Sequence, residues 1–202
     1  LPERGTYDRS VIDAILDEAL ICHVALADDE GRPVVIPTIH ARVGDVLYLH
    51  GSPASRMLRG IRNRQVSVAA TLLDGLVLAK AHMHHSMNYR SVVAFGTARA
   101  VTDPDEKAVA FRAIVEHLVK GRWEGARQPN DQEFRATSVV AVDIEEASAK
   151  QRRGPPGDDE ADLALPYWAG VIPVALQAGP PVRQSDAPLP DHVAGWDPAP
   201  QA

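Results

Sequence analysis

The residue types best suited to binding a phosphate gather in segment 50–56, HGSPASR. Gly51 lets the backbone approach a ligand closely, Ser52 and Ser55 add hydroxyl donors, and Arg56 adds a guanidinium fork that matches a phosphate. The segment is expected at the end of a strand and the start of a helix, where free N–H groups point outward. It therefore predicts an anion site. The alternative is that Ser52 only caps the helix and Arg56 is solvated.

A second polar segment, 80–91 (KAHMHHSMNYRS), contains three histidines within four residues. His84 and His85 are adjacent, so on a strand they would point to opposite faces. His82 and His84 could share a face, but no carboxylate or cysteine lies close by to complete a metal shell. The pattern therefore favours a polar pocket over a metal site, and a solvated loop with one structural histidine is the alternative.

The same segment supplies hydrogen-bond donors suited to a cofactor. Asn88, Tyr89, Arg90 and Ser91 can bond to carbonyl, hydroxyl or phosphate oxygens. A further group follows at Lys150 and the neighbouring arginines, which could meet an anionic ligand across a dimer or form only a charged linker. Trp168 lies in the apolar patch PYWAGVIPV, so segment 160–176 is expected to dock rather than stay free.

The elements that must position these residues follow from the hydrophobic period. Residues 8–19 have helical spacing with Asp8 as N-cap. A second helix is expected in 53–61 with Pro53 in its opening turn, and a third begins at Asp103-Pro104 and ends at Gly121. The expected strands are 21–27, 34–40, 46–50, 65–73, 76–82, 89–101 and 138–144. Asp74-Gly75 predicts a hairpin turn between two of them.

Closely spaced strands of this kind must pair antiparallel, because a parallel crossover needs a dozen residues or more. The fold class expected is mainly β (α+β): a small six- to seven-stranded antiparallel barrel, with two to three flanking helices and an extended C-terminal arm. Composition changes beyond Ala147, so the expected divisions are a barrel over 1–147, an arm over 148–176 and a Pro/Gly-rich tail over 177–202. No glycine-rich dinucleotide or P-loop motif is present.

Composition excludes several function classes. The 202 residues are 45% hydrophobic and carry a net charge of −6, which gives no basic face for nucleic acid. No run is long enough to span a membrane, and the first residues lack the order of a signal peptide, so a cytoplasmic protein is expected. Cys22 is alone, which excludes an internal disulfide and a multi-cysteine zinc site; it is expected to be buried.

Together the segments resemble the pyridoxamine 5′-phosphate oxidase-related family, the FMN-binding split barrels, and more closely the branch that includes nitroimidazole-resistance reductases. The resemblance covers about residues 4–175. The matching motifs are RGTYD, ICHVAL, VIPTIHAR, LYLHGSPASRML, TLLDGLVLAKAHMHHSMNYRSVVAFG, EASAK and RRGPPGDDEADLALPYWAGVIP.

The resemblance implies a homodimer with FMN in the groove between protomers. It assigns the phosphate to His50, Gly51, Ser52, Ser55 and Arg56, and the ring and ribityl chain to Ile36, Pro37, Thr38 and Ile39. The partner would complete the pocket with Asn88, Tyr89, Arg90 and the arm near Trp168. Lys80 or Arg90 could stabilise negative charge on the reduced ring, and His82, His84 or His85 could donate a proton.

The sequence departs from vitamin B6 oxidases in two places. It has Arg56-Met57 where they have an Arg-Lys pair, and its ending, PDHVAGWDPAPQA, lacks their basic substrate-binding residues. The function expected is an FMN-dependent oxidoreductase acting on a small molecule, nitroreductase-like or oxidase-like. The alternatives are a non-catalytic flavin or haem module, with a clustered histidine as axial ligand, or a purely structural dimer. A deazaflavin could enter the same phosphate loop.

Overall fold

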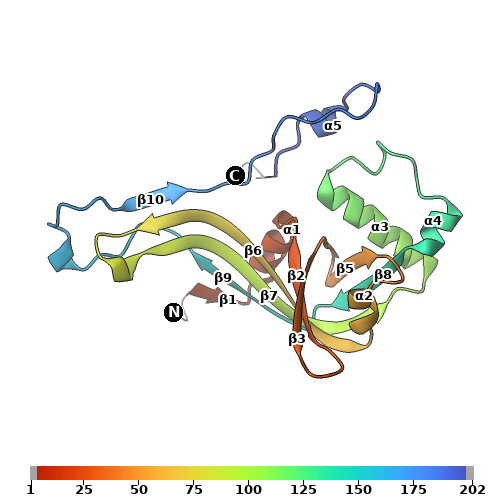
Figure 1. The fold of residues 1–202 in the computed structure, drawn as a ribbon, viewed down its shortest axis with the longest axis horizontal. Helices are drawn as coiled ribbons and strands as arrows, with labels where there is room; N and C mark the ends of the chain where they lie inside the picture. Colours follow the sequence, from red (N-terminus) through yellow and green to blue (C-terminus); the bar gives the residue numbers. More distant parts are fainter. Residues whose placement is uncertain (1–3, 199–202) are drawn as a thin grey trace.

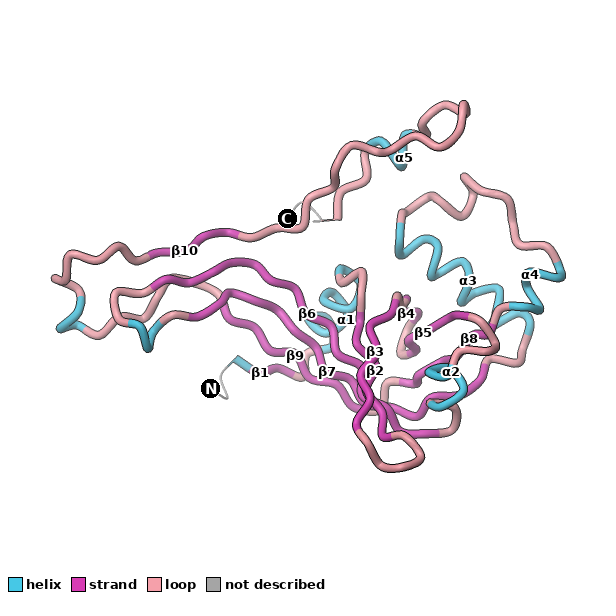
Figure 2. Tube along the Cα trace, in the orientation of Figure 1, coloured by secondary structure: helices cyan, strands magenta, loops and turns pink. Residues whose placement is uncertain are grey.

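The computed structural model describes residues 4–198 and shows one long antiparallel sheet with helices packed around one end (Figures 1 and 2). The helices are α1 (Arg9–Glu18), α2 (Arg56–Gly60), α3 (Pro104–Leu118), α4 (Asp131–Ala136) and α5 (Asp191–Ala194). The strands are β1 (Gly5–Thr6), β2 (Cys22–Ala27), β3 (Pro33–Thr38), β4 (Ala41–Val43), β5 (Val46–Gly51), β6 (Arg64–Leu78), β7 (Ser86–Ala100), β8 (Ser138–Asp143), β9 (Glu146–Arg152) and β10 (Gly170–Pro173). Short 3₁₀ turns occupy His82–His84 and Glu160–Asp162.

The sheet is a split barrel, and the long β6–β7 hairpin explains the split. The barrel strands follow the order β3-β2-β6-β7-β8-β5-β4. β6 pairs with β2 through residues 67–69, but further along, at 75–78, it pairs with β10. In the same way β7 pairs with β8 at 98–100 and with β9 at 89–95. One half of the hairpin therefore belongs to the barrel, and the other half forms an extension beyond it. The mainly β fold expected from the sequence is confirmed, with more strands than expected.

The hairpin turn predicted at Asp74-Gly75 is wrong. β6 runs through these residues with only a register shift between Leu73 and Gly75, and the chain turns at 79–85 instead. Gly75 serves a different purpose, because a Cβ there would lie 3.0 Å from Val171 Cγ1 and 3.1 Å from the Ile172 carbonyl oxygen. The glycine lets β10 lie close against the bulged strand.

The helices begin at local capping signals. Asp8 accepts a hydrogen bond from the Ser10 N–H and Asp103 accepts one from the Asp105 N–H, so both predicted N-caps are confirmed. Pro53, however, lies outside α2. Residues 52–55 form a turn, and Ser55 rather than Ser52 caps α2 by accepting from the Leu58 N–H.

Other boundaries also differ from those expected. The predicted strand over 34–40 is divided, since β3 ends at Thr38 and β4 begins at Ala41. α4 was not predicted, although its Asn130 and Glu133 form a capping box. β9 runs across residue 148, where the arm was expected to start, and α5 forms inside the segment expected to be extended.

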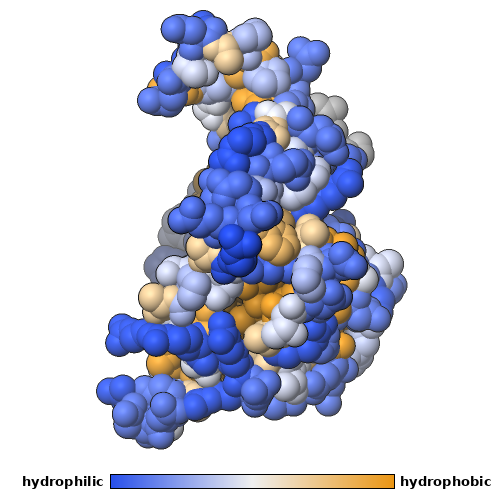
Figure 3. All heavy atoms as spheres, turned by 90° about the vertical axis from the view of Figure 1, so that its right-hand side faces the viewer, coloured by the Kyte–Doolittle hydropathy of each residue, from blue (hydrophilic) through white to orange (hydrophobic). Residues whose placement is uncertain are grey.

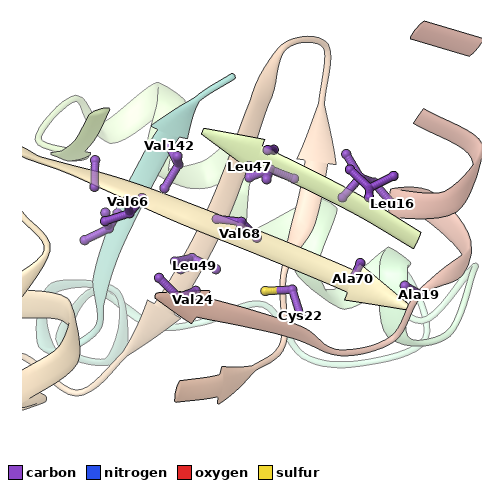
Figure 4. Close-up of a cluster of buried hydrophobic side chains, with 14 of the residues drawn as sticks. Leu16, Ala19, Cys22, Val24, Leu47, Leu49, Val66, Val68, Ala70 and Val142 are labelled. Atoms are coloured by element: carbon purple, nitrogen blue, oxygen red, sulfur yellow. The ribbon is translucent and has the colours of Figure 1, made fainter. Parts of the chain in front are cut away.

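The core lies inside the barrel, where β2, β5, β6 and β8 meet α1 (Figure 4). Cys22 is fully buried there, as predicted. Burial raises the pKa of its thiol to about 12, so the thiol stays protonated and unreactive at neutral pH. A second buried cluster, including Tyr48 and Ile114, attaches α3 to the other side of the barrel.

After β10 the chain returns along the length of the molecule to α5, which lies near the helical end (Figure 1). We call residues 174–198 the C-terminal segment. Its far end packs against the loop that follows α3, where a Cβ added at Gly125 would lie 2.7 Å from the His192 Cε1 atom. No helix in residues 4–198 is long and apolar enough to cross a membrane.

Candidate functional site

In the predicted phosphate-binding segment, residues 50–56, one positively charged side chain has no partner within the described chain. The Ser52 hydroxyl oxygen accepts from the Ala54 N–H at 3.2 Å, and Ser55 is occupied as the cap of α2. Within residues 4–198, the exposed Arg56 side chain forms no hydrogen bond or ion pair. With five residues, α2 has little dipole to offer an anion. The guanidinium of Arg56 therefore carries the anion-binding capacity of this segment.

Arg56 borders a cleft of about 680 Å³ between α2 and the β2–β3 hairpin. Ile36, another residue predicted to bind the cofactor, lines the same cleft. Two other arginines in the lining are neutralised, because Arg32 pairs with Asp28 and Glu30 while Arg64 pairs with Asp29. The unpaired charge of the cleft lies on the α2 side. The end of the molecule that carries α2, α3 and α4 also shows apolar atoms in a recess among hydrophilic residues (Figure 3).

A second, more apolar pocket of about 570 Å³ lies on the outer face of the sheet. Its lining consists of Glu18, Ala19, Leu20, Ile21, His23, Pro37, Thr71, Leu72, Leu73, Asp74, Arg90, Val174, Ala175, Leu176 and Pro198. Pro37 and Arg90 were predicted to bind the cofactor, and His23 was not. Strand alternation separates Pro37 from Ile36, so the two neighbours line different cavities.

Arg90 is held by two carboxylates. It bonds to Glu18 with two nitrogens and to Asp74 with Nε and a terminal nitrogen, the shortest contact to Asp74 being 2.8 Å. These carboxylates raise the pKa of Arg90, which stays charged at every accessible pH. The network fixes the guanidinium as one corner of the apolar pocket, with two negative charges around one positive charge.

The predicted residues at the hairpin tip contact other parts of the chain. The Lys80 ammonium donates to the Leu163 and Leu165 carbonyl oxygens at 2.6 Å each. Asn88 is nearly buried, donates to the Gly154 carbonyl oxygen at 3.1 Å and accepts from Arg152. Both residues therefore hold the segment that follows β9 against the tip.

The three clustered histidines surround the 3₁₀ turn of the tip. His84 Nε2 lies 3.6 Å from an Asp159 carboxylate oxygen, and His85 Nδ1 lies 3.2 Å from the Ala81 carbonyl oxygen. The rings of His82 and His85 are 6.1 Å apart. Within residues 4–198 no group of three or more histidine, cysteine or acidic side chains is arranged to hold a metal ion.

The remaining predicted residues are dispersed. His50 lies on β5 with its Nδ1 atom buried and without a partner in the described chain, and burial lowers its pKa. Thr38 and Ile39 lie where β3 ends, and the Thr38 hydroxyl donates to the Ile39 carbonyl oxygen at 3.4 Å. Tyr89 on β7 lies opposite Arg152 on β9. Trp168 is 65% exposed and covers Gly170.

Exposed apolar side chains form a continuous row on the outer face of the sheet. The register places Pro37, His23, Ala69 and Val93 opposite one another across β3, β2, β6 and β7. Phe95, 45% exposed, extends the same face along β7. Pro37 and His23 line the pocket beneath residues 174–176, whereas Val93 and Phe95 remain exposed on the sheet face, where a monomer rarely leaves a large apolar patch open.

Two features of the site were missed from the sequence. His23 could have been found, because buried Cys22 and Val24 on either side require it to point outward from the barrel. The other is a basic cleft of about 350 Å³ lined by Arg4, Arg152 and Arg153. This cleft forms only because β1 pairs with β9, which lies far from it in the sequence.

Comparison with known proteins identifies the family. Residues 8–151 match the family described as pyridoxamine 5′-phosphate oxidase. This chain belongs to that family. The resemblance expected from the sequence is therefore confirmed. No curated protein matches the sequence.

Solved structures extend the similarity over nearly the whole chain. The flavocytochrome Anf3 from Azotobacter vinelandii is 39% identical with a TM-score of 0.87, over 95% of this chain and 91% of that one. The FAD and haem binding protein from Mycobacterium smegmatis is 34% identical with a TM-score of 0.90, over 96% and 97%. A 5-nitroimidazole antibiotic resistance protein from Bacteroides thetaiotaomicron is 29% identical with a TM-score of 0.61, over 72% and 85%.

Proposed function

We propose that this protein is a homodimeric flavohaem oxidoreductase that transfers electrons between a bound flavin and a bound haem. The observation that carries the proposal is the likeness, over at least 95% of the chain, to a flavocytochrome and to an FAD and haem binding protein. A likeness over 72% to the nitroimidazole resistance protein supports a flavin reductase less well, because it leaves more of the chain unmatched.

The flavin site proposed here includes the Arg56 cleft. Arg56 has no competing carboxylate, so its guanidinium is available for a flavin phosphate. FMN, the flavin expected from the sequence, would need only this site. FAD carries a second phosphate next to the first, and the FAD and haem binding protein from Mycobacterium smegmatis is 34% identical over 96% of this chain. We therefore propose FAD as the resident flavin.

Dimer formation would use the outer sheet face. Val93 and Phe95 on β7 and Val35 on β3 are between 36% and 59% exposed on the same sheet, which makes the face suited to an apolar interface. A second copy would cover these side chains and exclude water from the cofactor. A bound flavin supplies hydride and single-electron transfer, while this chain binds it, orients it and shields it.

The first test is an absorption spectrum of the purified protein, with the cofactors then released and identified. We expect flavin bands together with an intense haem band, FAD on chromatography, and a mass of two 21.8-kDa chains by light scattering. When a reductant that reduces the bound flavin is added to the protein without oxygen, the haem should become reduced as well. A colourless protein that binds neither FAD nor FMN in titration would contradict the proposal, and FMN alone would correct the flavin assignment.

A further inference from the structure

We propose that His23 is an axial ligand of a haem seated in the apolar pocket beneath the C-terminal segment. This inference rests on the proposed function, because it assigns the place of one of its two cofactors. The pocket is the one of about 570 Å³ on the outer face of the sheet. Its volume lies within the range of cofactor and ligand sites.

The side chain of His23 is free to coordinate a metal. His23 is the second residue of β2 and projects away from the barrel core, between Pro37 on β3 and Ala69 on β6. In the described chain the imidazole forms no hydrogen bond and no ion pair. A histidine imidazole is a common ligand for haem iron.

The walls around His23 suit a porphyrin. Leu20, Ile21, Leu73 and Leu176 present apolar surface, and Ile21 and Leu176 are more than half exposed in this chain. Covering them with a flat apolar ligand would remove that surface from water. At the polar corner, Arg90 is already shared by Glu18 and Asp74, so a haem propionate would be repelled there. The propionates are therefore expected at the open side of the pocket.

The roof of the pocket belongs to a part of the chain that two similar structures named for a haem or cytochrome share. Val174, Ala175, Leu176 and Pro198 of the C-terminal segment complete the lining. These two structures, at 39% and 34% identity, cover 95% and 96% of this chain, so their alignment must include most of that segment. The family match itself ends at residue 151.

The histidines at the hairpin tip fit less well. His82, His84 and His85 surround an exposed 3₁₀ turn, and none of them lines the apolar pocket. His84 lies beside Asp159 and His85 beside the Ala81 carbonyl oxygen. Their surroundings are those of solvated groups, whereas His23 alone among the histidines of the described chain lines this pocket.

The lining also predicts how many ligands the chain supplies. Apart from His23 it contains no histidine, methionine, cysteine, lysine or tyrosine among the described residues. One protein ligand leaves a coordination position open. The bound haem should therefore be high-spin and should bind carbon monoxide when reduced.

The test compares haem binding by the full-length protein and two variants. Haemin is titrated into wild type, His23→Ala and His85→Ala, and the haem band, EPR signal and flavin content are recorded. We expect His23→Ala to lose at least 90% of the ligated haem signal while keeping its flavin content, which shows that it is folded. His85→Ala should keep the haem signal of wild type. Added imidazole should restore the ligated spectrum of His23→Ala.

The outcomes separate this inference from the proposed function. Wild-type protein that binds flavin but not haemin would overturn the haem half of the proposed function and this inference with it. Haem binding with an unchanged spectrum in His23→Ala would overturn the inference alone and leave a flavohaem protein. Loss of the haem signal in His85→Ala instead would assign the ligand to the hairpin tip.

Discussion

Among single residues, His40 shows how burial and hydrogen bonding fix the charge of a side chain. It is completely buried, its Nε2–H donates to the Leu16 carbonyl oxygen at 2.9 Å, and its Nδ1 atom has no partner in the described chain. The ring of His117 lies 5.0 Å away and donates to the Ala19 carbonyl oxygen. The two histidines thus satisfy carbonyl groups at the end of α1 that the helix itself leaves open.

The state of His40 predicts a pH dependence of stability. Burial, with His117 beside it, lowers the pKa of His40 to about 4. The unfolded chain, with a histidine pKa near 6.5, binds the proton first, so the free energy of unfolding falls as pH drops from about 6.5 to about 4. Between pH 7.5 and 4.5, wild type should lose about 2–3 kcal/mol more than His40→Gln, measured by urea unfolding. Parallel pH profiles would show that His40 takes up its proton over the same pH range in the folded and unfolded protein, which would contradict the lowered pKa.

Arg56 predicts a selective loss of affinity for phosphorylated flavins. Arg56→Ala removes a charge-assisted contact, so the affinity for FMN should fall roughly 10- to 100-fold. Riboflavin, which lacks the phosphate, should bind equally well to both proteins. The matched control is Arg112→Ala, since Arg112 lies on α3 and pairs with Glu124. Fluorescence titration measures all three, and an equal loss for riboflavin would mean that Arg56 acts through folding.

At the scale of elements, Lys80 attaches the segment after β9 to the hairpin tip. Its ammonium bonds to two carbonyl oxygens near residue 164, and Asp158 accepts from the Lys80 backbone N–H at 2.8 Å. Lys80→Met should therefore increase chymotryptic cleavage at Tyr167 and Trp168 roughly 5- to 30-fold, because local opening becomes easier. Lys120→Met, at an exposed site without side-chain partners in the described chain, should leave the cleavage rate unchanged.

Gly96 marks the point where β7 exchanges one partner strand for another. β7 pairs with β9 up to Phe95 and with β8 from Ala98. A Cβ at Gly96 would lie 1.8 Å from the Asp143 carbonyl oxygen, so the backbone would have to move. Gly96→Ala should lower the free energy of unfolding by about 3 kcal/mol. Gly157→Ala, where a Cβ meets nothing within 4 Å, is the control in the same denaturant titration.

For the whole molecule, the exposed face of the sheet predicts the oligomeric state. Phe95→Glu would place a charge in the proposed interface, and light scattering should then give the mass of one 21.8-kDa chain. Flavin should be lost as well, because the proposed site lies between two copies. Val109→Glu on α3, a position 48% exposed, should remain dimeric. If Phe95→Glu keeps the mass of a dimer, the interface must lie on another face of the molecule.

The sequence predicts well what is decided locally. The caps of α1 and α3 were predicted because Asp8 and Asp103 bond to their own helices. The turn at Asp74-Gly75 could not be predicted correctly, because β10, almost a hundred residues later, decides the conformation there. The same holds for the site. Arg56 follows from a short motif, whereas the roof over His23 depends on chain that returns from the opposite end of the molecule.

The roof over His23 has a consequence for assembly. Residues 174–198 follow every other lining residue in the chain, so during synthesis the floor and walls of the pocket leave the ribosome first. N-terminal parts of a protein generally fold as they emerge. A flat ligand could therefore enter from above while the pocket is still open, and the last part of the chain would then close over it. Chain order would thus allow cofactor loading without any later opening of the mature protein.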